Sequence, residues 1–429
     1  MHEPSTILLV AHGYPPKECA GTERHTEALA HALSAQGHRV HVLAATRAPG
    51  RPQYEVMRSG NVTRVVNNIA TRALADGESD PNIDRIAATI EMEIKPDVVH
   101  IHHTQFLSST MRFKAPTVVT LHDQWAWCAS GGLGLKNGDH LCEGPDPDRC
   151  APCHAEWRPA PSRSARWLTR AAAAASPLVN PDRLHKIYQR LPSSLRPSPV
   201  RGGVHTEAPD AAEHRNSMVL NWHRNADALI APSQHLANQA SGHELGPIAV
   251  IRHGLSDEWF APRTSVTGDA PFVHIGTVAM HKGTDLVVSA HRSLESGPRL
   301  VLHGSVLDPK AALGHPVGQA LDPEGVRTAL QGARALVLGS RWPENAPLII
   351  IEARAVGCPI IAPRIGGIPE LIEDGIDGFL YAPNNEVELH DAMRRLLDGP
   401  PLEPRPPPKF RDQLVRIEAI YRRVQRKSA

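Results

Sequence analysis

Short runs of apolar residues alternate along this 429-residue chain with segments whose apolar positions recur every three or four residues. The first run, "TILLVA" at residues 6–11, is followed at residues 22–37 by a segment with the spacing of an amphipathic helix. Thr22 suits the cap that begins this helix, and Gly37 suits the position after its end. Further strand-like runs lie at residues 39–45, 96–103, 115–123, 228–234 and 248–254. This alternation predicts a parallel sheet with helices on its faces.

A second unit of the same kind follows a polar stretch at residues 255–271. Its strand-like runs begin at residue 272 and recur at residues 299–305, 333–340, 358–364 and 378–383. We therefore predict an α/β protein with two Rossmann-like, doubly wound domains, residues 1–255 and 256–408, that face a central cleft. In such sheets, ligands bind at the carboxyl ends of the strands.

The end of the chain, residues 409–429, has apolar positions on one face of a helix. These positions are Leu414, Ile417, Ile420, Tyr421 and Val424. We expect this helix to pack back on the N-terminal domain. Because its other face is basic, peripheral contact with a membrane surface is the alternative.

Composition narrows the class of protein. The 46 Lys and Arg residues nearly balance the 45 Asp and Glu residues, so the net charge of +1 gives no general attraction to nucleic acid. No apolar run is long enough to span a membrane, and the N-terminus lacks the basic start of a signal peptide. We therefore expect a cytoplasmic protein, in which disulfides are disfavoured.

Four of the six cysteines fall in a Gly-, Pro- and Asp-rich insert at about residues 125–157. They are Cys128, Cys142, Cys150 and Cys153. Four thiolates can hold a tetrahedral zinc ion, so we predict a structural zinc site. Unligated thiols are the first alternative. The sequence Cys-x-x-Cys-His also occurs in redox and haem sites, but its position in a loop and the expected compartment disfavour both.

The segment richest in candidate chemistry is "RWPENAPLIIIEARAVGCPIIA", residues 341–362. Pro347 suits the first turn of a helix, where its missing N–H group is not needed. Glu344 would then lie in the loop before the helix and Glu352 within it. The start of a helix presents backbone N–H groups and a positive dipole end, which favour a diphosphate. One carboxylate can reach sugar hydroxyls and the other a ribose diol.

Two glutamates at this spacing occur often by chance, but here Gly357, Pro359, "RIGGIPELI" and "DGFLYAP" follow in order. With these landmarks the chain resembles the retaining glycosyltransferases of family 4 over nearly its whole length, and in particular those members with a four-cysteine insert in the N-terminal domain. The resemblance implies the GT-B fold and transfer of a sugar from a nucleotide diphosphate sugar, with UDP- or GDP-sugars as the main candidates. It leaves open whether the acceptor is a small molecule, a natural product or a lipid-linked saccharide.

Several N-terminal positions carry over from this resemblance. Residues 20–23, "AGTE", match the family's Gly-Gly-x-Glu loop, although Ala20 replaces the first glycine. Gly21 is therefore expected close to the donor phosphates. His122 in "TLHD" is expected to contact the transferred sugar, and the alternative is a structural histidine paired with Asp123.

The loop "GTVAMHKG" matches the family's diphosphate-binding loop in the second domain. Lys282 corresponds to its lysine, but Thr277 stands where the family has an arginine. That replacement removes one charge-assisted contact. We expect either that another cation, such as His281 or Arg364, compensates for it, or that the donor is held more weakly.

The same resemblance makes Glu344 the residue that orients the sugar and Lys282 a group that stabilises the departing diphosphate. Backbone N–H groups after the glutamate would bind sugar hydroxyls; Asn345, Ala346 and Leu348 can donate, whereas Pro347 cannot. Glu352 is expected on the ribose. No catalytic metal is implied, and we interpret the Asp-x-Asp of "PDPD", Asp146 and Asp148, as turn residues.

Two other functions remain as alternatives. A nucleotide-sugar epimerase of the same fold would consume donor without an acceptor, and a non-catalytic binding protein would hold donor without consuming it. A Rossmann dehydrogenase is disfavoured, because no Gly-x-Gly-x-x-Gly follows the first strand.

Overall fold

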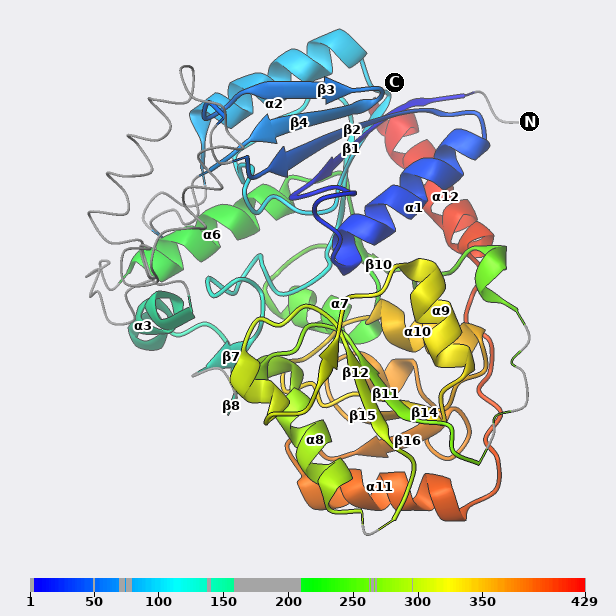
Figure 1. The fold of residues 1–429 in the computed structure, drawn as a ribbon. Helices are drawn as coiled ribbons and strands as arrows, with labels where there is room; N and C mark the ends of the chain where they lie inside the picture. Colours follow the sequence, from blue (N-terminus) through cyan, green and yellow to red (C-terminus); the bar gives the residue numbers. More distant parts are fainter. Residues whose placement is uncertain are drawn as a thin grey trace.

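Two parallel sheets, one in each half of the chain, organise the computed structural model (Figure 1). The structure describes residues 4–48, 51–68, 74, 79–136, 140–157, 210–261, 263, 266, 268–294 and 296–428. The first sheet uses strands up to Val250 and the second begins at Phe272, so the change of sheet falls in the stretch expected to link the two domains.

Among the residues that the structure describes, the N-terminal sheet has eight strands in the order β10-β9-β6-β5-β1-β2-β4-β3. Their bounds are Thr6–Ala11 (β1), Arg39–Thr46 (β2), Val56–Ser59 (β3), Val62–Val66 (β4), Val98–Ile101 (β5), Thr117–Thr120 (β6), Ala228–Ala231 (β9) and Ile248–Val250 (β10). All neighbours pair in parallel except β3 and β4. The central strands are fully buried, which explains why they read as continuous apolar runs in the sequence.

Helices cover both faces of this sheet. They include α1 (Gly21–Ala35), α2 (Pro81–Ile94), α6 (Ala211–Arg224) and α7 (Gln234–Gly242). The apolar faces of α2, α6 and α7 share one core with the sheet, and α1 belongs to the core on the opposite face. The cysteine-containing insert adds the short hairpin β7 (Leu135–Lys136) and β8 (His140–Leu141) and the helix α3 (Pro147–Trp157).

In the part of the second domain that the structure describes, the sheet has six strands, all parallel, in the order β13-β12-β11-β14-β15-β16. Their bounds are Phe272–Ile275 (β11), Leu300–His303 (β12), Val317–Gly318 (β13), Ala335–Val337 (β14), Ile360–Pro363 (β15) and Gly378–Tyr381 (β16). The helices α8 (Thr284–Arg292) and α11 (Glu386–Asp398) pack on one face, and α9 (Pro323–Gln331) and α10 (Leu348–Ala355) pack on the other. Short 3-10 helices are η2 (Asp257–Trp259), η3 (Met280–Lys282), η4 (Pro309–Ala312) and η5 (Ile368–Glu370).

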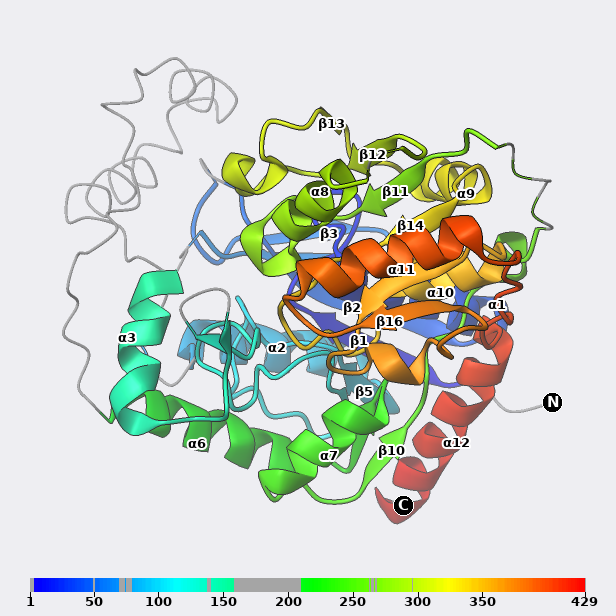
Figure 2. The same ribbon diagram turned by 90° about the horizontal axis from the view of Figure 1, so that it is seen from below.

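The last helix, α12 (Phe410–Ser428), returns to the N-terminal domain and lies beside α1 (Figures 1 and 2). The apolar residues singled out in the sequence are all buried in the core that α1 shares with the first sheet. The apolar face of α12 is therefore covered by protein and not open to a membrane surface. Within the described residues, no helix combines the length and the apolar character that crossing a bilayer requires.

Two helix boundaries differ from the sequence prediction by a residue or two. The cap of α1 is Ala20, not Thr22, and Thr22 lies inside the helix. Similarly, Pro347 is the residue before α10 and does not lie in its first turn. Neither cap residue bonds the helix through its side chain, so the pattern of capping side chains gave no accurate signal at these two sites.

Candidate active site

A cleft of about 520 Å³ lies between the two sheets and is lined by both domains. Its walls come from segments that follow the carboxyl ends of β1, β6, β11 and β14, as expected for parallel sheets. Eight residues predicted to bind the donor or the sugar line it: Gly21, His122, Lys282, Glu344, Asn345, Ala346, Leu348 and Glu352. Positions that are as much as 331 residues apart in the sequence are thus brought to one cavity.

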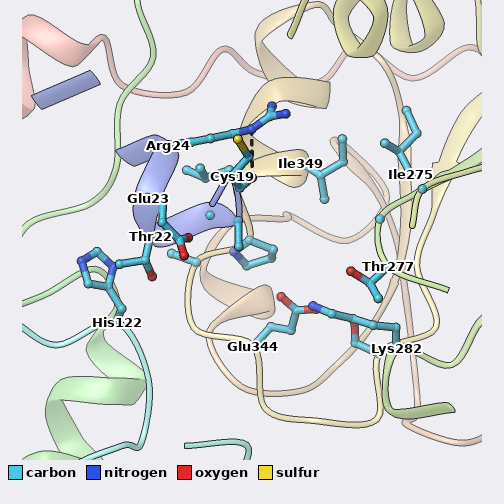
Figure 3. Close-up of a pocket in the computed structure, with 18 of the residues that line it drawn as sticks. Cys19, Thr22, Glu23, Arg24, His122, Ile275, Thr277, Lys282, Glu344 and Ile349 are labelled. Atoms are coloured by element: carbon cyan, nitrogen blue, oxygen red, sulfur yellow. Dashed lines mark hydrogen bonds and ion pairs between the residues drawn. The ribbon is translucent and has the colours of Figure 1, made fainter. Parts of the chain in front are cut away.

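Lys282 and Glu344 form the polar centre of the C-terminal wall. The Lys282 Nζ atom donates to Glu344 Oε1 at 2.8 Å, and Ser340 Oγ donates to the same oxygen at 2.7 Å. Burial alone would raise the pKa of Glu344, but the Lys282 ammonium and these hydrogen bonds lower it, so the carboxylate is ionised at neutral pH. The Lys282 ammonium also lies 4.6 Å from the centre of the Trp342 ring. Figure 3 shows the two charged side chains pointing toward each other, with Thr277 beside them.

Two helices begin at the cleft from opposite walls. The N-terminus of α1 lies on one side and that of α10 on the other, and neither has a side-chain cap. A Cβ atom built on Gly21 would have Leu348 Cδ1 as its nearest neighbour, at 4.0 Å, so the two helix starts approach closely. Ala20 has φ −76°, a backbone conformation open to any residue, which explains why alanine is accepted where the family has glycine. Two positive helix ends therefore face one space.

Glu352 lies within α10 and is only 8% exposed. Burial raises the pKa of its carboxyl group to about 7, and the nearby Arg24 guanidinium opposes this rise. Glu352 also lines a second cavity of about 560 Å³ behind α1. The carboxylate therefore stands between two cavities with an incompletely compensated charge, which is typical of a group that binds a ligand.

His122 follows β6 on the N-terminal wall. Its Nε2 lies 3.1 Å from His102 Nδ1, so one ring donates to the other, and its backbone oxygen accepts a hydrogen bond of 3.0 Å from Asn345 Nδ2. Burial, and then the neighbouring histidines, hold the pKa of His122 well below its usual range, so the ring is neutral at pH 7. Asp123 pairs instead with His103, at 3.4 Å, which removes the alternative reading of His122 as the partner of Asp123.

A second imidazole–carboxylate pair lies on the same wall. His12 Nε2 is 3.0 Å from Glu23 Oε1, and the rings of His12 and His103 are in edge contact at 4.5 Å. Burial would raise the pKa of Glu23, but the bond with His12 lowers it. Sequence reasoning missed His12, although it directly follows the first strand and could have been recognised as a strand-end polar residue.

The two cations expected to replace the missing arginine at Thr277 do not line the cleft. Arg364 forms an exposed ion pair with Asp374 at 3.1 Å, and burial lowers the pKa of His281 to about 4, so this ring is neutral. That part of the prediction is wrong. Among the described residues that line the cleft, Arg24 is the only lysine or arginine besides Lys282. Its guanidinium donates to the backbone oxygens of Cys19 and Leu321 at 3.2 and 3.5 Å. Through these two bonds Arg24 contacts both domains. Figure 3 shows its bond to the neighbouring Cys19.

The four cysteines of the insert line a separate cavity of about 50 Å³. All four are free thiols. Burial raises the pKa of Cys128, Cys150 and Cys153, and at Cys153 the charges of the other three cysteines raise it further. Backbone N–H groups of the glycine-rich turn after Cys128 favour its thiolate. Nevertheless, no three His, Cys, Asp or Glu side chains in the described part of the chain stand in an arrangement that would hold a metal ion.

Two family profiles match the chain, one in each half. Residues 20–179 match the family described as Glycosyltransferase Family 4, and residues 256–412 match the one described as Glycosyl transferases group 1. Both walls of the cleft therefore come from segments similar to glycosyltransferases.

Two named glycosyltransferases are similar to the chain in sequence. Glycogen synthase of Mycobacterium tuberculosis H37Rv is 26% identical and aligns 92% of this chain with 86% of its own length. D-inositol 3-phosphate glycosyltransferase of Mycobacteroides abscessus is 27% identical over 49% of this chain and 50% of its own.

Solved structures show the same fold over both domains. Sucrose-phosphate synthase from Thermosynechococcus elongatus superposes with a TM-score of 0.61 and 17% identity, over 99% of this chain and 97% of its own. HepE from Anabaena, in complex with UDP and glucose, gives a TM-score of 0.55 and 15% identity over 99% and 94%. The predicted fold class, two Rossmann-like domains that face a central cleft, is confirmed.

Proposed function

We propose that this chain, a glycosyltransferase with the GT-B fold, transfers a sugar from a nucleotide diphosphate sugar to a hydroxyl-bearing acceptor with retention at the anomeric carbon. The observation that carries this proposal is the meeting of Lys282 and two uncapped helix starts in one cleft. Such a group of donors suits a diphosphate, whose negative charge grows as the bond to the sugar breaks.

The charges on the two walls have separate roles in this proposal. Lys282 is already bonded to Glu344, so its ammonium is fixed in place before the donor binds. Arg24 supplies the second cation in place of the family arginine, since it lies at the start of α1 and faces the C-terminal domain. Glu352 accepts hydrogen bonds from the ribose diol. The UDP in the structure of Anabaena HepE supports a UDP-sugar as the first donor to test.

The sugar would lie between Glu344 and His122, which belong to different domains. Glu344 accepts hydrogen bonds from sugar hydroxyls, and the backbone N–H groups of Asn345, Ala346 and Leu348 lie next to it in the chain. A neutral His122 can donate or accept a hydrogen bond without placing a second positive charge beside a cationic, oxocarbenium-like sugar. No covalent nucleophile is assigned.

A donor panel tests the proposal. UDP-, GDP-, ADP- and dTDP-sugars are compared by thermal shift, then by slow hydrolysis, and the best donor is offered to small-molecule and lipid-linked acceptors. The product's anomeric configuration is read by NMR. Transfer with retention supports the proposal. Conversion of the donor without an acceptor would indicate an epimerase, and binding without any turnover would indicate a binding protein.

The substitution Lys282→Ala tests the role of this lysine at the departing diphosphate. Loss of a preorganised charge at a departing group lowers kcat by roughly 100-fold or more. Lys310→Ala is the control, because Lys310 is an exposed lysine of the same domain that does not line the cleft. Equal activity of the two variants would contradict the role of Lys282.

We also propose that the cysteines of the insert bind one structural zinc ion. Support comes from the convergence of Cys128, Cys142, Cys150 and Cys153 on one cavity and from the N–H groups around Cys128. Because the side chains as placed do not form a binding set, the thiols must turn toward the cavity on binding. Purified protein should contain about one zinc per chain, by the four-ligand stoichiometry of such sites. Cys150→Ser should lose the zinc and Cys19→Ser should retain it; zinc-free wild-type protein contradicts the proposal.

A further inference from the structure

A carboxylate of the C-terminal domain caps the N-terminus of a helix in the N-terminal domain. Glu370, at the end of η5, accepts hydrogen bonds from the backbone N–H groups of Gln234 at 2.9 Å and His235 at 2.6 Å. These are the first two residues of α7, and Ser233 caps the third N–H group through its own side chain. Arg252, after β10, lies 3.6 Å from the same carboxylate. The first turn of α7 therefore depends on a residue from the other domain.

The backbone that leads to Glu370 is packed without room for side chains. A Cβ atom on Gly367 would lie 2.9 Å from the Cβ of Ser233 and would also overlap the backbone oxygen of Asn345. Gly366 has φ +60°, and its Cβ would overlap the backbone of Glu344. In addition, the Gly367 N–H group donates to the Glu344 backbone oxygen at 2.7 Å. The glycines thus join Glu370 directly to the loop that carries the sugar-binding glutamate.

The same loop makes a second contact across the cleft, the hydrogen bond from Asn345 Nδ2 to the His122 backbone oxygen. The loop of Glu344 and Asn345 is therefore attached to the N-terminal domain at two places, one inside the cleft and one at α7. We propose that Glu370 is a positioning residue for sugar transfer, which holds this loop against His122 by capping α7 across the domain boundary. This role rests on the proposed transferase function.

The chemistry of the contact suits a link that forms only on domain closure. A carboxylate at a helix N-terminus is stabilised by the positive dipole end and by charge-assisted bonds to N–H groups that otherwise have no partner in the helix. When the domains separate, both N–H groups and the carboxylate return to water. Replacing Glu370 therefore shifts the equilibrium toward the open form, in which Glu344 and His122 do not face one sugar.

The test compares Glu370→Gln and Glu370→Ala with Glu373→Gln in the full-length chain. Glu373 is close by in sequence, but it pairs with Arg405 of its own domain and does not line the cleft. We measure kcat, the KM of the acceptor, the Kd of UDP by calorimetry and the radius of gyration with UDP by small-angle scattering. In our proposal UDP binds to Lys282, Glu352 and the start of α10 on the C-terminal wall, and to Arg24 and the start of α1 on the other. Its Kd should therefore change less than kcat, because the sugar depends on Glu344 and His122 facing each other.

The expected result is a fall in kcat of about tenfold or more for both Glu370 variants, as for loss of a charge-assisted hydrogen bond, with a larger radius of gyration. Glu373→Gln should match the wild type. An unchanged kcat and radius in folded Glu370→Gln would overturn the proposal, and so would equal losses of UDP affinity and kcat in that variant. Failure of the wild type to transfer sugar would refute the proposed function. The scattering comparison would still test whether Glu370 holds the two domains together through α7.

Discussion

The substitution Glu352→Gln should make the protein more stable and, at the same time, a weaker binder of nucleotide. Burial raises the pKa of Glu352 from its ordinary 4.5 to about 7 in the folded chain. The folded state therefore holds a proton between these pH values that the unfolded state has released. Stability from this group falls as pH rises through that window, and it stays low above pH 7, where both states are ionised.

The size of the effect follows from the same numbers. A pKa rise from 4.5 to about 7 corresponds to roughly 3 kcal/mol of destabilisation by the ionised carboxylate above pH 7. Glutamine has nearly the same shape and no charge. Glu352→Gln should therefore raise the free energy of unfolding by up to about 3 kcal/mol at pH 8 and by little at pH 5.

Denaturant titrations at pH 5 and pH 8 measure this difference, with Glu324→Gln as the control on the exposed surface of α9. UDP affinity, measured on the same samples, should fall by roughly tenfold at pH 8, because a charged acceptor for the ribose diol is lost. Wild-type affinity should also fall below pH 7, where Glu352 takes up a proton, and the variant should show no such dependence. A variant equally destabilised or stabilised at both pH values would refute the reasoning.

Three further predictions concern histidines of the N-terminal domain. His122→Ala should lower kcat by roughly 100-fold and change UDP affinity little, because His122 faces the sugar from the opposite domain; kinetics and calorimetry check both. Tyr421→Phe should lower the free energy of unfolding by about 1–3 kcal/mol in denaturant titrations, because His100 Nδ1 loses its 2.6 Å bond to the Tyr421 hydroxyl. Burial lowers the pKa of His100 to about 3 and that of His253 to about 4, so these two groups should cost stability as pH falls below 6.5, by about 3 kcal/mol per pH unit together while they remain neutral in the fold. Because Glu352 contributes with the opposite sign in this range, the measurement uses Glu352→Gln, and a flat profile of that variant from pH 6.5 to 4.5 contradicts this.

The strands of both sheets were predictable because they are buried on both faces. The run at residues 6–11 coincides with β1, and residues 39–45 differ from β2 by one residue. The hairpin of β3 and β4 was missed. It lies at the sheet edge, where β3 is mostly exposed and mixes polar with apolar residues, so it carries no continuous apolar run.

The site residues that could be predicted are those that lie in or beside motifs recognisable in the sequence. Lys282, Glu344 and Glu352 follow recognisable strands and helices, so their approach to one cleft could be expected. Arg24 could not be singled out in the same way, because an arginine after a glutamate in the first turn of an amphipathic helix reads as a solvent-exposed residue. Its orientation depends on the second domain, which lies opposite α1 only in the folded chain.

Glu370 shows more clearly which contacts sequence patterns cannot reveal. Its partners are backbone N–H groups of a helix up to 136 residues away, and a backbone group has no residue type for a sequence pattern to register. The same holds for Asn345, whose side chain bonds a backbone oxygen of the other domain. Apart from Arg24, sequence patterns therefore identify the charged groups that would bind the donor, whereas the contacts that hold the walls together are visible only in the fold. If sugar transfer requires the closed form, substitutions at such contacts will lower kcat in this chain without touching the donor.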